Sequence, residues 1–390
     1  MGQTGRGFPY GGYMKKIIFD VDGVLLSEER YYDVSGLAAW EVLYSKDYMG
    51  LPSERNDFDP SSVTDGQIAA VRAMVWGHDR LLTWLKSHGI NSNWDMVHAF
   101  LVTTLWIMGE EYRARTGEPL SLSLHKEADC KSAGLLLMGL PIPSADTVLQ
   151  TWKEAIPDDA QGEAVFGALA EKMKKTFGAV PDWAALQSDF WHIHTAAFQD
   201  WYLGDDEFIR QNGHMPWSGG KKGFLRAEIP LAPKNAILSL FKRLKAKGYS
   251  IAVATGRSRN EMTIPFKELG WYGEFDPLYL GTATDAFEAS KICAGAFLDK
   301  PHPFIYECAM YGRHPESYPA YAEGKRKPGE GDVVWVVGDS YSDILGAHAA
   351  GAHIVGVLTG LEGKKAVPMF EKAGVPYVDR VTDIESVIEG

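Results

Sequence analysis

Residues 15–26 read KKIIFDVDGVLL, in which an apolar run ends at Phe19 and two aspartates, Asp20 and Asp22, follow. A short β-branched run bounded by turn residues predicts a buried strand of a parallel sheet. Ligands of open α/β sheets bind at the carboxyl edge of such strands. The pattern therefore predicts two neighbouring carboxylates at a ligand-binding edge.

From about residue 230 the chain alternates between apolar helical faces and short apolar runs. We expect strands at 251–254, 278–280, 333–337, 354–358 and 377–378, and helices that include 237–244, 262–269 and 384–388. The polar stretch 313–331, which is rich in proline and glycine, predicts a long exposed loop. Strands that alternate with helices indicate right-handed βαβ units. The predicted fold class is therefore α/β, with a Rossmann-like core built on a parallel sheet.

The long stretch between these two parts has a helical pattern. Apolar residues recur at helical spacings, for example at Ile68, Val71 and Val75, and most tryptophans of the chain lie here. Such spacing is typical of amphipathic helices, and a stretch of roughly 200 residues is large enough for its own core. We therefore expect a large α-helical domain, residues 27–226, inserted into an α/β domain formed by residues 14–26 and 227–390.

The composition argues against some classes of partner. The 390 residues include 39 basic and 51 acidic side chains, so the formal net charge is −12. An acidic protein is not expected to have a general affinity for nucleic acid or for anionic membranes. A small anionic substrate stays open, since a local site on an acidic protein can be positive.

Cysteine usage and hydropathy indicate a reducing compartment and no membrane span. The three cysteines, Cys130, Cys293 and Cys308, form no CxxC pair, so neither a disulfide framework nor a zinc ribbon is predicted. The apolar runs are shorter than the ~20 residues that a membrane-spanning helix needs. Residues 1–13 are rich in glycine and lack the apolar region of a signal peptide. We therefore expect a flexible N-terminal extension and a cytoplasmic protein.

Further chemistry-bearing residues lie at or near the ends of predicted strands. Thr255 lies in IAVATGR, Lys300 in LDKPHPFIY, and Asp339 and Asp343 in VVWVVGDSYSDILGAHAAG. Taken in order after FDVDGVLL, these segments resemble motifs II to IV of the haloacid dehalogenase-like (HAD) superfamily, and FDVDGVLL resembles its motif I. The resemblance covers the predicted α/β domain. It implies a HAD-like fold in which the helical insertion is a C1-type cap, a lid over the catalytic strand ends.

The resemblance also implies a role for each aspartate of the first motif. Asp20 would be the nucleophile that becomes an aspartyl-phosphate, and Asp22 would be the general acid and base. A carboxylate nucleophile divides phosphoryl transfer into two easier steps, and an alkoxide leaving group needs a proton donor. Dehalogenases of this superfamily lack the second aspartate, so Asp22 favours phosphoryl chemistry.

Three residues of the later motifs suit the binding of phosphate. By resemblance, Thr255 offers a hydroxyl group, Gly256 a backbone amide and Lys300 a compact positive charge. Phosphoryl transfer spreads negative charge over the equatorial oxygens, so a site needs such donors and cations.

The carboxylates of these motifs suit a hard cation. Carboxylates that lie close together need a cation or a shared proton, and Mg²⁺ binds one or two carboxylates together with water and substrate phosphate. The metal ligands that the resemblance implies are Asp20, the backbone carbonyl of Asp22, Asp339 and Asp343. Asp343 would act through a water molecule or by orienting Lys300.

Some polar residues of the helical domain allow two interpretations. Lys221, Lys222 and Arg226 lie where the insertion should rejoin the α/β domain. They would either contact a second anionic group of a substrate or belong to a solvated hinge. His192 and His194 lack a third metal ligand, so core or interface histidines are favoured.

These observations predict a Mg²⁺-dependent phosphatase that hydrolyses a small phosphorylated metabolite through an aspartyl-phosphate. Two alternatives stay open: a phosphomutase that returns the phosphoryl group to a bound sugar, and a non-catalytic binding protein on a HAD scaffold. Release of inorganic phosphate would distinguish hydrolysis from isomerisation. We expect neither nucleic acid nor membrane as a partner, and the sequence predicts no oligomeric state.

Overall fold

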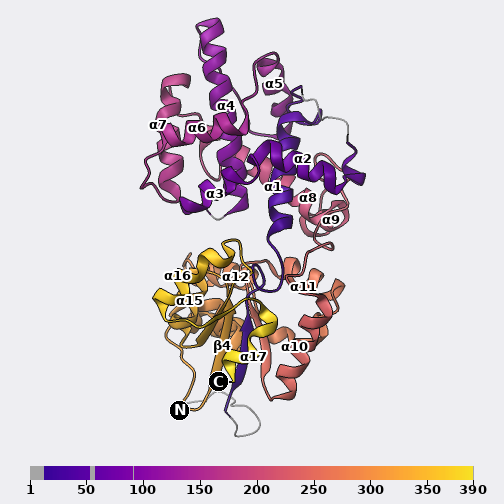
Figure 1. The fold of residues 1–390 in the computed structure, drawn as a ribbon. Helices are drawn as coiled ribbons and strands as arrows, with labels where there is room; N and C mark the ends of the chain where they lie inside the picture. Colours follow the sequence, from indigo (N-terminus) through magenta and orange to yellow (C-terminus); the bar gives the residue numbers. More distant parts are fainter. Residues whose placement is uncertain (1–12, 53–57, 91, 390) are drawn as a thin grey trace. The chain divides into compact units, whose positions relative to one another are not determined.

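The structure, a computed structural model, describes residues 13–52, 58–90 and 92–389. The chain divides into two compact units (Figure 1). They are Met1–Glu28 with Arg226–Gly390, called the α/β unit, and Glu29–Leu225, called the helical unit. The helical insertion expected at 27–226 differs from the helical unit by two residues at its start and one at its end. Of the extension expected at 1–13, only Tyr13 lies within the described residues.

A parallel sheet of six strands forms the centre of the described α/β unit. The strands are β1 (Lys15–Phe19), β2 (Ser250–Ala254), β3 (Leu280–Gly281), β4 (Val333–Gly338), β5 (His353–Val357) and β6 (Tyr377–Val378). Their order is β3-β2-β1-β4-β5-β6, and Figure 1 shows β1 in indigo inside the orange sheet. The predicted α/β fold class with a parallel sheet is confirmed.

The strand order reverses direction at β1. The chain builds β2 and β3 on one side of β1 and then returns to build β4, β5 and β6 on the other side. Phe19, the last residue of β1, lies beside Val253 of β2 and Val337 of β4. The residues that follow these three strands therefore meet at one edge, at the kind of switch point where ligands bind in open α/β sheets.

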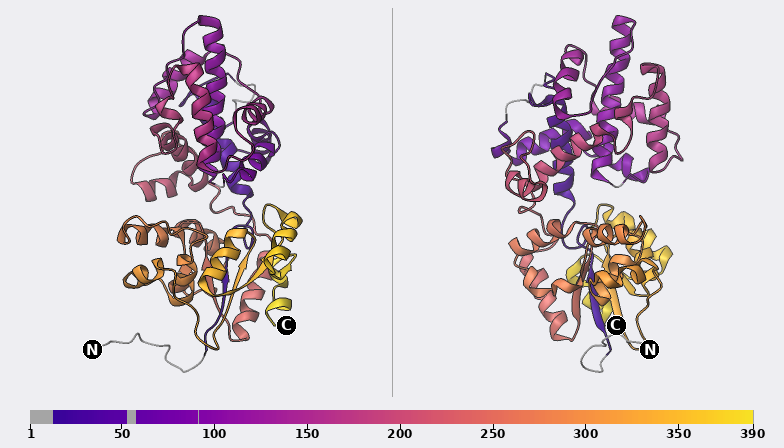
Figure 2. Two further views of the ribbon diagram at one scale, coloured as in Figure 1. Left: turned by 90° about the vertical axis from the view of Figure 1, so that its left-hand side faces the viewer. Right: turned by 180° about the vertical axis from the view of Figure 1, so that it is seen from behind.

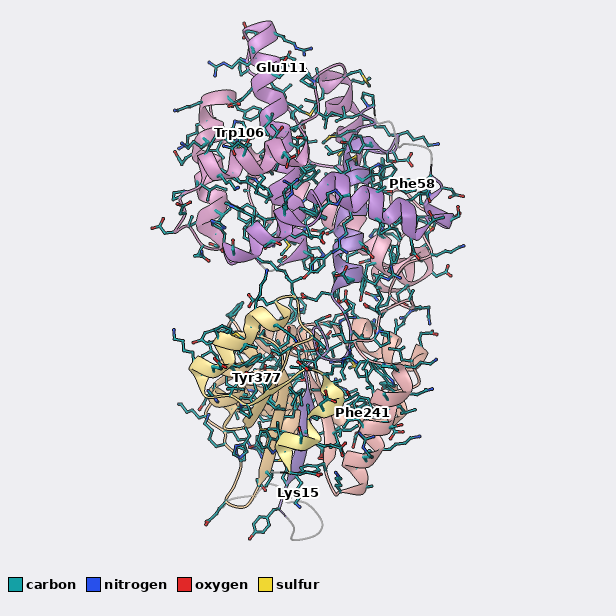
Figure 3. All side chains as sticks on the ribbon, in the orientation of Figure 1. Lys15, Phe58, Trp106, Glu111, Phe241 and Tyr377 are labelled. Atoms are coloured by element: carbon teal, nitrogen blue, oxygen red, sulfur yellow. The ribbon has the colours of Figure 1, made fainter. Side chains whose placement is uncertain are left out.

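Helices cover both faces of this sheet (Figure 2). One face carries α10 (Lys234–Ala246), α11 (Arg259–Glu268) and α17 (Glu385–Ile388), and the other carries α12 (Ala283–Ile292), α13 (Phe304–Tyr311), α14 (Tyr318–Ala322), α15 (Tyr341–Ala350) and α16 (Val367–Ala373). Side chains alternate across β1, so Phe19 packs on the first face and Ile18 on the second. The ring of Phe241, labelled in Figure 3, lies edge-on to that of Phe19 with centroids 5.2 Å apart. Burial of each such side chain contributes about 1.5–3 kcal/mol.

Serine caps fix where two helices begin behind the carboxyl edge of the sheet. Ser258 caps α11 after β2, and Ser340 caps α15 after β4. Each hydroxyl accepts a hydrogen bond from the third residue of its helix, and the acidic side chain of that residue accepts one from the cap, which is a capping box. Both helices therefore start directly beside the candidate site.

Two sequence predictions in this unit were wrong. The strand expected at 278–280 is mostly a 3₁₀ turn, Pro277–Tyr279, and β3 begins at Leu280. The loop expected at 313–331 contains α14, whose Tyr318 and Tyr321 are buried. Proline and glycine suggested exposure there, but the two aromatic side chains anchor the segment in the core.

The helical unit has its own core. Its helices are α1 (Glu29–Tyr44), α2 (Asp65–Trp76), α3 (Arg80–Ser87), α4 (Asn93–Thr116), α5 (Glu127–Leu137), α6 (Ala145–Ala155), α7 (Glu163–Phe177), α8 (Asp189–Leu203) and α9 (Asp205–Asn212). Among them, α1 packs against α2, α4 and α8. Trp106, labelled in Figure 3, donates from α4 to Thr176 of α7 at 2.9 Å. Within the described residues, none of the helices is long and apolar enough to cross a membrane.

The two histidines of α8, His192 and His194, lie on opposite faces of the helix, one exposed and one buried. His194 is buried, and its Nε2 lies 3.0 Å from Nδ1 of His98 on α4. Burial lowers the pKa of both imidazoles, that of His98 to about 4. His192 is exposed. The expectation of core or interface histidines is therefore confirmed for His194, a core residue, while His192 is not a core residue and an interface role for it stays a prediction.

Lys221 is a core residue rather than a hinge or a substrate contact. Its Nζ lies 2.9 Å from Oε1 of Glu41 on α1 and 2.5 Å from Oδ2 of Asp200 on α8, and all three side chains are buried. Burial raises the pKa of Asp200 to about 7, against the attraction of the ammonium group. The neighbouring Lys222 is exposed. The segment that contains Lys221 leads out of the helical unit. The two ion pairs of Lys221 attach this segment to α1 and α8.

Lys221→Met is expected to lower the free energy of unfolding by about 3–5 kcal/mol, because it leaves two buried carboxylates without their cation. Urea unfolding followed by tryptophan fluorescence measures this change. Lys222→Met is the matched control, and its effect should stay within about 0.5 kcal/mol. Equal effects of the two substitutions would contradict the proposed role of Lys221.

A second stability prediction concerns pH. Glu307 of α13 is buried, and neither carboxylate oxygen has a hydrogen-bond partner among the described residues. Burial raises its pKa from 4.5 to about 7, although Lys327 and Arg326 oppose this. Between these two pKa values the folded state binds more protons than the unfolded state, so stability falls as the pH rises through this window.

Glu307→Gln should remove this dependence. From pH 4.5 to pH 8 the unaltered protein is expected to lose on the order of 1–3 kcal/mol of stability relative to the variant. Urea unfolding at both pH values gives the difference, and Glu330→Gln, at an exposed position, serves as control. Parallel pH profiles for the unaltered protein and Glu307→Gln would refute the prediction.

Candidate active site

Asp20 follows β1 directly and is held at both carboxylate oxygens. Its backbone amide donates to the carbonyl of Val337 at 2.9 Å, which continues the pairing with β4. Oδ1 accepts from the amide of Val21 at 2.8 Å, and Oδ2 lies 2.8 Å from Nζ of Lys300. The side chain is buried. Burial raises the pKa of Asp20 to about 7, although Lys300 opposes this.

Lys300 lies between two carboxylates. Its Nζ is 2.8 Å from Oδ2 of Asp20 and 2.7 Å from Oδ1 of Asp343. Burial alone would lower the pKa of the ammonium group, but the two negative charges outweigh burial and raise it well above its ordinary value. Lys300 therefore carries a fixed positive charge at the carboxyl edge of the sheet.

Asp343 is fully engaged by its surroundings. Oδ1 accepts from the hydroxyl of Tyr306 at 2.9 Å in addition to Lys300. Oδ2 accepts from the hydroxyl of Ser340 at 2.7 Å and from the backbone amides of Ser340 and Asp339 at 3.2 and 3.3 Å. Burial favours the neutral acid, but Lys300 and these donors lower the pKa of Asp343. Asp343 thus contacts Lys300, which agrees with one of the two roles expected for it, and the role itself stays a prediction.

Asp339, unlike Asp343, has no hydrogen-bond donors among the described residues to offset its burial. Within the described residues its carboxylate accepts no hydrogen bond, and burial with the charges of Asp343, Asp20 and Glu28 raises its pKa well above the ordinary value. A Cβ atom on Gly23 would lie 2.2 Å from its Oδ2, and one on Gly360 would lie 1.8 Å away. Only glycine at these two positions lets the carboxylate lie against the turn that follows Asp20.

The three carboxylates fit a hard divalent cation. Oxygen atoms of Asp20, Asp339 and Asp343 all lie within 4.8 Å of one another. Oxygen is the ligand that Mg²⁺ prefers, and the uncompensated charge of Asp339 is the kind that a cation relieves. Because Asp343 already accepts several hydrogen bonds, Asp20 and Asp339 are the freer ligands. The identity of the cation and its ligands stays a prediction.

The predicted phosphate-binding residues of the second motif follow β2. The amide of Thr255 donates to the carbonyl of Gly281 at 3.0 Å, and its buried hydroxyl accepts from the amide of Arg257 at 3.1 Å. Gly256 is exposed, and its amide donates to none of the described residues. Because β2 neighbours β1, these groups belong to the same edge of the sheet as Asp20. The exposed Gly256 amide is available to an anion, whereas a phosphate contact of the buried Thr255 hydroxyl stays a prediction.

The carboxylate of Asp22 forms an ion pair with Arg257, a contact that the motif alone did not predict. Nε of Arg257 lies 3.0 and 3.1 Å from its two carboxylate oxygens, and Nη2 lies 2.7 Å from Oδ1. Its side chain is therefore not part of the carboxylate group that surrounds the candidate metal site. The expected contribution of its backbone carbonyl to a metal stays a prediction.

Comparison with known proteins identifies the family. A family model described as HAD-hydrolase-like matches residues 297–384, which include Lys300, Asp339 and Asp343. A crystal structure of a Northeast Structural Genomics Consortium target, whose name states no activity, is 31% identical with a TM-score of 0.82, over 96% of this chain and 98% of that one. The chain belongs to the HAD-like hydrolases.

A curated relative of this HAD-like hydrolase carries the name of a phosphatase. A phosphoglycolate phosphatase of Pasteurella multocida is 29% identical over 155 residues, which are 39% of this chain and 56% of the relative. The chain thus matches little more than half the length of this curated relative. Phosphatase Tt82 of Thermococcus thioreducens has 16% identity and a TM-score of 0.41, over 96% of this chain and 99% of that one.

Sequence reasoning missed three residues around the site of this HAD-like hydrolase. Tyr306, Arg257 and Glu228 are buried and contact Asp343, Asp22 and Arg257, respectively. Arg257 lies inside the second motif, so its position was known but its partner was not. Tyr306 ends the segment LDKPHPFIY that contains Lys300, but its contact with Asp343 was not predicted, and Glu228 lies outside all of the motif segments.

Mg²⁺ is expected to stabilise this HAD-like hydrolase against unfolding, by about 2.7 kcal/mol when its concentration is a hundred times the dissociation constant. Asp339→Asn should reduce or abolish the stabilisation, because it removes the uncompensated charge. Thermal unfolding with and without Mg²⁺ at constant ionic strength tests this. Asp379→Asn, at an exposed position directly after β6, is the matched control, and equal stabilisation of both variants would count against a metal site at Asp339.

Proposed function

We propose that the protein is a metal-dependent phosphatase that hydrolyses a small phosphorylated compound through a phosphorylated Asp20. The observation that carries the proposal is the Asp20 carboxylate, which is held by Lys300 beside Asp339 and Asp343 at the carboxyl edge of the sheet. A buried carboxylate that contacts a fixed ammonium group and lies near two further carboxylates suits nucleophilic attack on a phosphoryl group.

In the first step, an oxygen of Asp20 attacks phosphorus in line with the leaving oxygen. The Val21 amide and Lys300 hold the carboxylate in one orientation, which favours attack from a fixed geometry. The hydroxyl of Thr255, the amide of Gly256 and the ammonium group of Lys300 donate to the phosphoryl oxygens as charge spreads over them. The bond from phosphorus to the leaving oxygen breaks as the bond to Asp20 forms.

Asp22 transfers the protons. It gives a proton to the leaving oxygen in the first step, so that an alcohol rather than an alkoxide departs. In the second step it accepts a proton from the water molecule that attacks phosphorus, which releases phosphate and restores Asp20. Each step therefore needs the Asp22 carboxyl group within hydrogen-bond distance of the reacting oxygen.

A divalent cation held by Asp20 and Asp339, with Asp343 as the third carboxylate, would neutralise charge on the phosphoryl group when bound. Mg²⁺ is the proposed ion, since the ligand set is all oxygen. The helical unit is proposed to act as a cap that excludes bulk water and selects the leaving group.

The substrate is proposed to be a small phosphorylated metabolite. The curated relative from Pasteurella multocida is named a phosphoglycolate phosphatase, so phosphoglycolate belongs in the first set of compounds to test. Sugar phosphates complete that set, since they would also reveal the phosphomutase alternative as isomerisation without phosphate release.

Purified protein should release phosphate from at least one compound of such a panel with Mg²⁺, and EDTA should abolish the release. Asp20→Asn is expected to lower the rate on the order of a thousandfold or more, because the amide is not a nucleophile for phosphorus. Asp379→Asn should keep the original rate. Phosphate release that survives Asp20→Asn, or a metal-loaded, folded protein that releases none, would overturn the proposed function.

A further inference from the structure

Arg257 contacts Asp22 through two of its nitrogen atoms. Nη2 and Nε lie 2.7 and 3.0 Å from Oδ1 of Asp22, and Nε lies 3.1 Å from Oδ2. The arginine side chain is 1% exposed and that of Asp22 is 27% exposed. Among the described residues, Arg257 supplies every hydrogen bond that the Asp22 carboxylate accepts. A planar guanidinium group that donates twice fixes both the position and the plane of a carboxylate.

Arg257 is itself held by the segment that returns to the α/β unit. Its Nη1 lies 2.7 Å from Oε1 of Glu228 and donates to the carbonyl of Glu261 at 3.2 Å. Glu228 is buried. Next to it, the carbonyl of Ile229 accepts from the amide of Ser27 at 2.8 Å. Arg257 thus connects Asp22 to the chain segment at residues 226–230, where the α/β unit resumes after the helical unit.

We propose that Arg257 is a positioning residue that holds the carboxyl group of Asp22 for proton transfer, and that Glu228 holds Arg257 in place. This inference rests on the proposed phosphatase function. Asp22 lies in a tight turn, since the amides of Val24, Leu25 and Leu26 all point to the carbonyl of Val21. The turn fixes the backbone of Asp22 but not its side chain, so the orientation of the carboxyl group depends on Arg257.

A role in positioning differs from a purely structural ion pair in its dependence on the leaving group. An alkyl alcohol leaves only if Asp22 donates a proton to it, whereas 4-nitrophenolate leaves without one. Loss of Asp22 orientation should therefore slow the first step for an alkyl phosphate and spare it for 4-nitrophenyl phosphate. Loss of structure alone would slow both reactions by the same factor.

The experiment measures release of the leaving group in a single turnover, with enzyme in excess over substrate, which isolates the first step. Arg257→Met is expected to slow the alkyl phosphate about 10- to 100-fold, the effect of a misplaced catalytic group, and 4-nitrophenyl phosphate less than about threefold. Asp22→Asn should show the same selectivity with a larger effect. Arg257→Lys should fall between Arg257→Met and the unaltered protein, since lysine keeps the charge and loses the planar pair of donors.

Glu228→Gln keeps the shape of the side chain and should also slow the alkyl phosphate more than 4-nitrophenyl phosphate, by a smaller factor than Arg257→Met. It serves as the test if Arg257→Met does not fold. Arg243→Gln is the matched control. Arg243 also donates twice to one carboxylate, that of Glu385, but it lies near the end of α10, which leads into the start of β2. The Arg243→Gln substitution should leave the rates with both substrates unchanged.

Equal slowing of the two substrates, or no slowing of either, by Arg257→Met and Glu228→Gln would overturn the positioning role while the phosphatase proposal stands. An unaltered, metal-loaded protein that releases no leaving group would instead overturn the proposed function, and the positioning role with it.

Discussion

One ammonium group between two buried carboxylates holds the candidate site together. Lys300 lies 2.8 Å from Asp20 and 2.7 Å from Asp343, and without it three acidic groups within 4.8 Å of one another would repel. Asp343 is secured by Tyr306, Ser340 and backbone amides, so Lys300 is placed with little freedom. Three carboxylates face one ammonium group, and the carboxylate of Asp339 accepts no hydrogen bond among the described residues. A site with more carboxylates than cations is prepared for a metal ion and, through that ion and Lys300, for a phosphate group.

The fold supplies this arrangement from segments that lie far apart in the sequence. The strand order brings the ends of β1, β2 and β4 to one edge, and serine caps start α11 and α15 immediately behind it. Gly23 and Gly360 leave space for the Asp339 carboxylate. Each of these features restricts the positions that a side chain of the site can take. The carboxylates therefore stay close together although their negative charges repel.

Much of this arrangement was predictable from sequence, for a physical reason. A buried strand of a parallel sheet is a short apolar run, and a polar residue that ends it has to lie at the sheet edge, so Asp20, Thr255 and Asp339 could be placed without a structure. The pairings of Arg257 with Asp22 and of Lys221 with Glu41 and Asp200 could not, since each joins residues that no periodicity relates. Local composition also failed at 313–331, where Tyr318 and Tyr321 are buried despite the surrounding proline and glycine.

The proposed function depends on the phosphorylation of Asp20. The most direct test is to mix Asp22→Asn protein, in which hydrolysis of the intermediate should be slow, with 4-nitrophenyl phosphate and Mg²⁺, quench in acid and measure the masses of its peptides. We expect the peptide that contains Asp20 to gain the mass of one phosphoryl group and to lose it on treatment with hydroxylamine. A phosphoryl group on another residue, or none on the Asp22→Asn protein while it releases 4-nitrophenol, would contradict it.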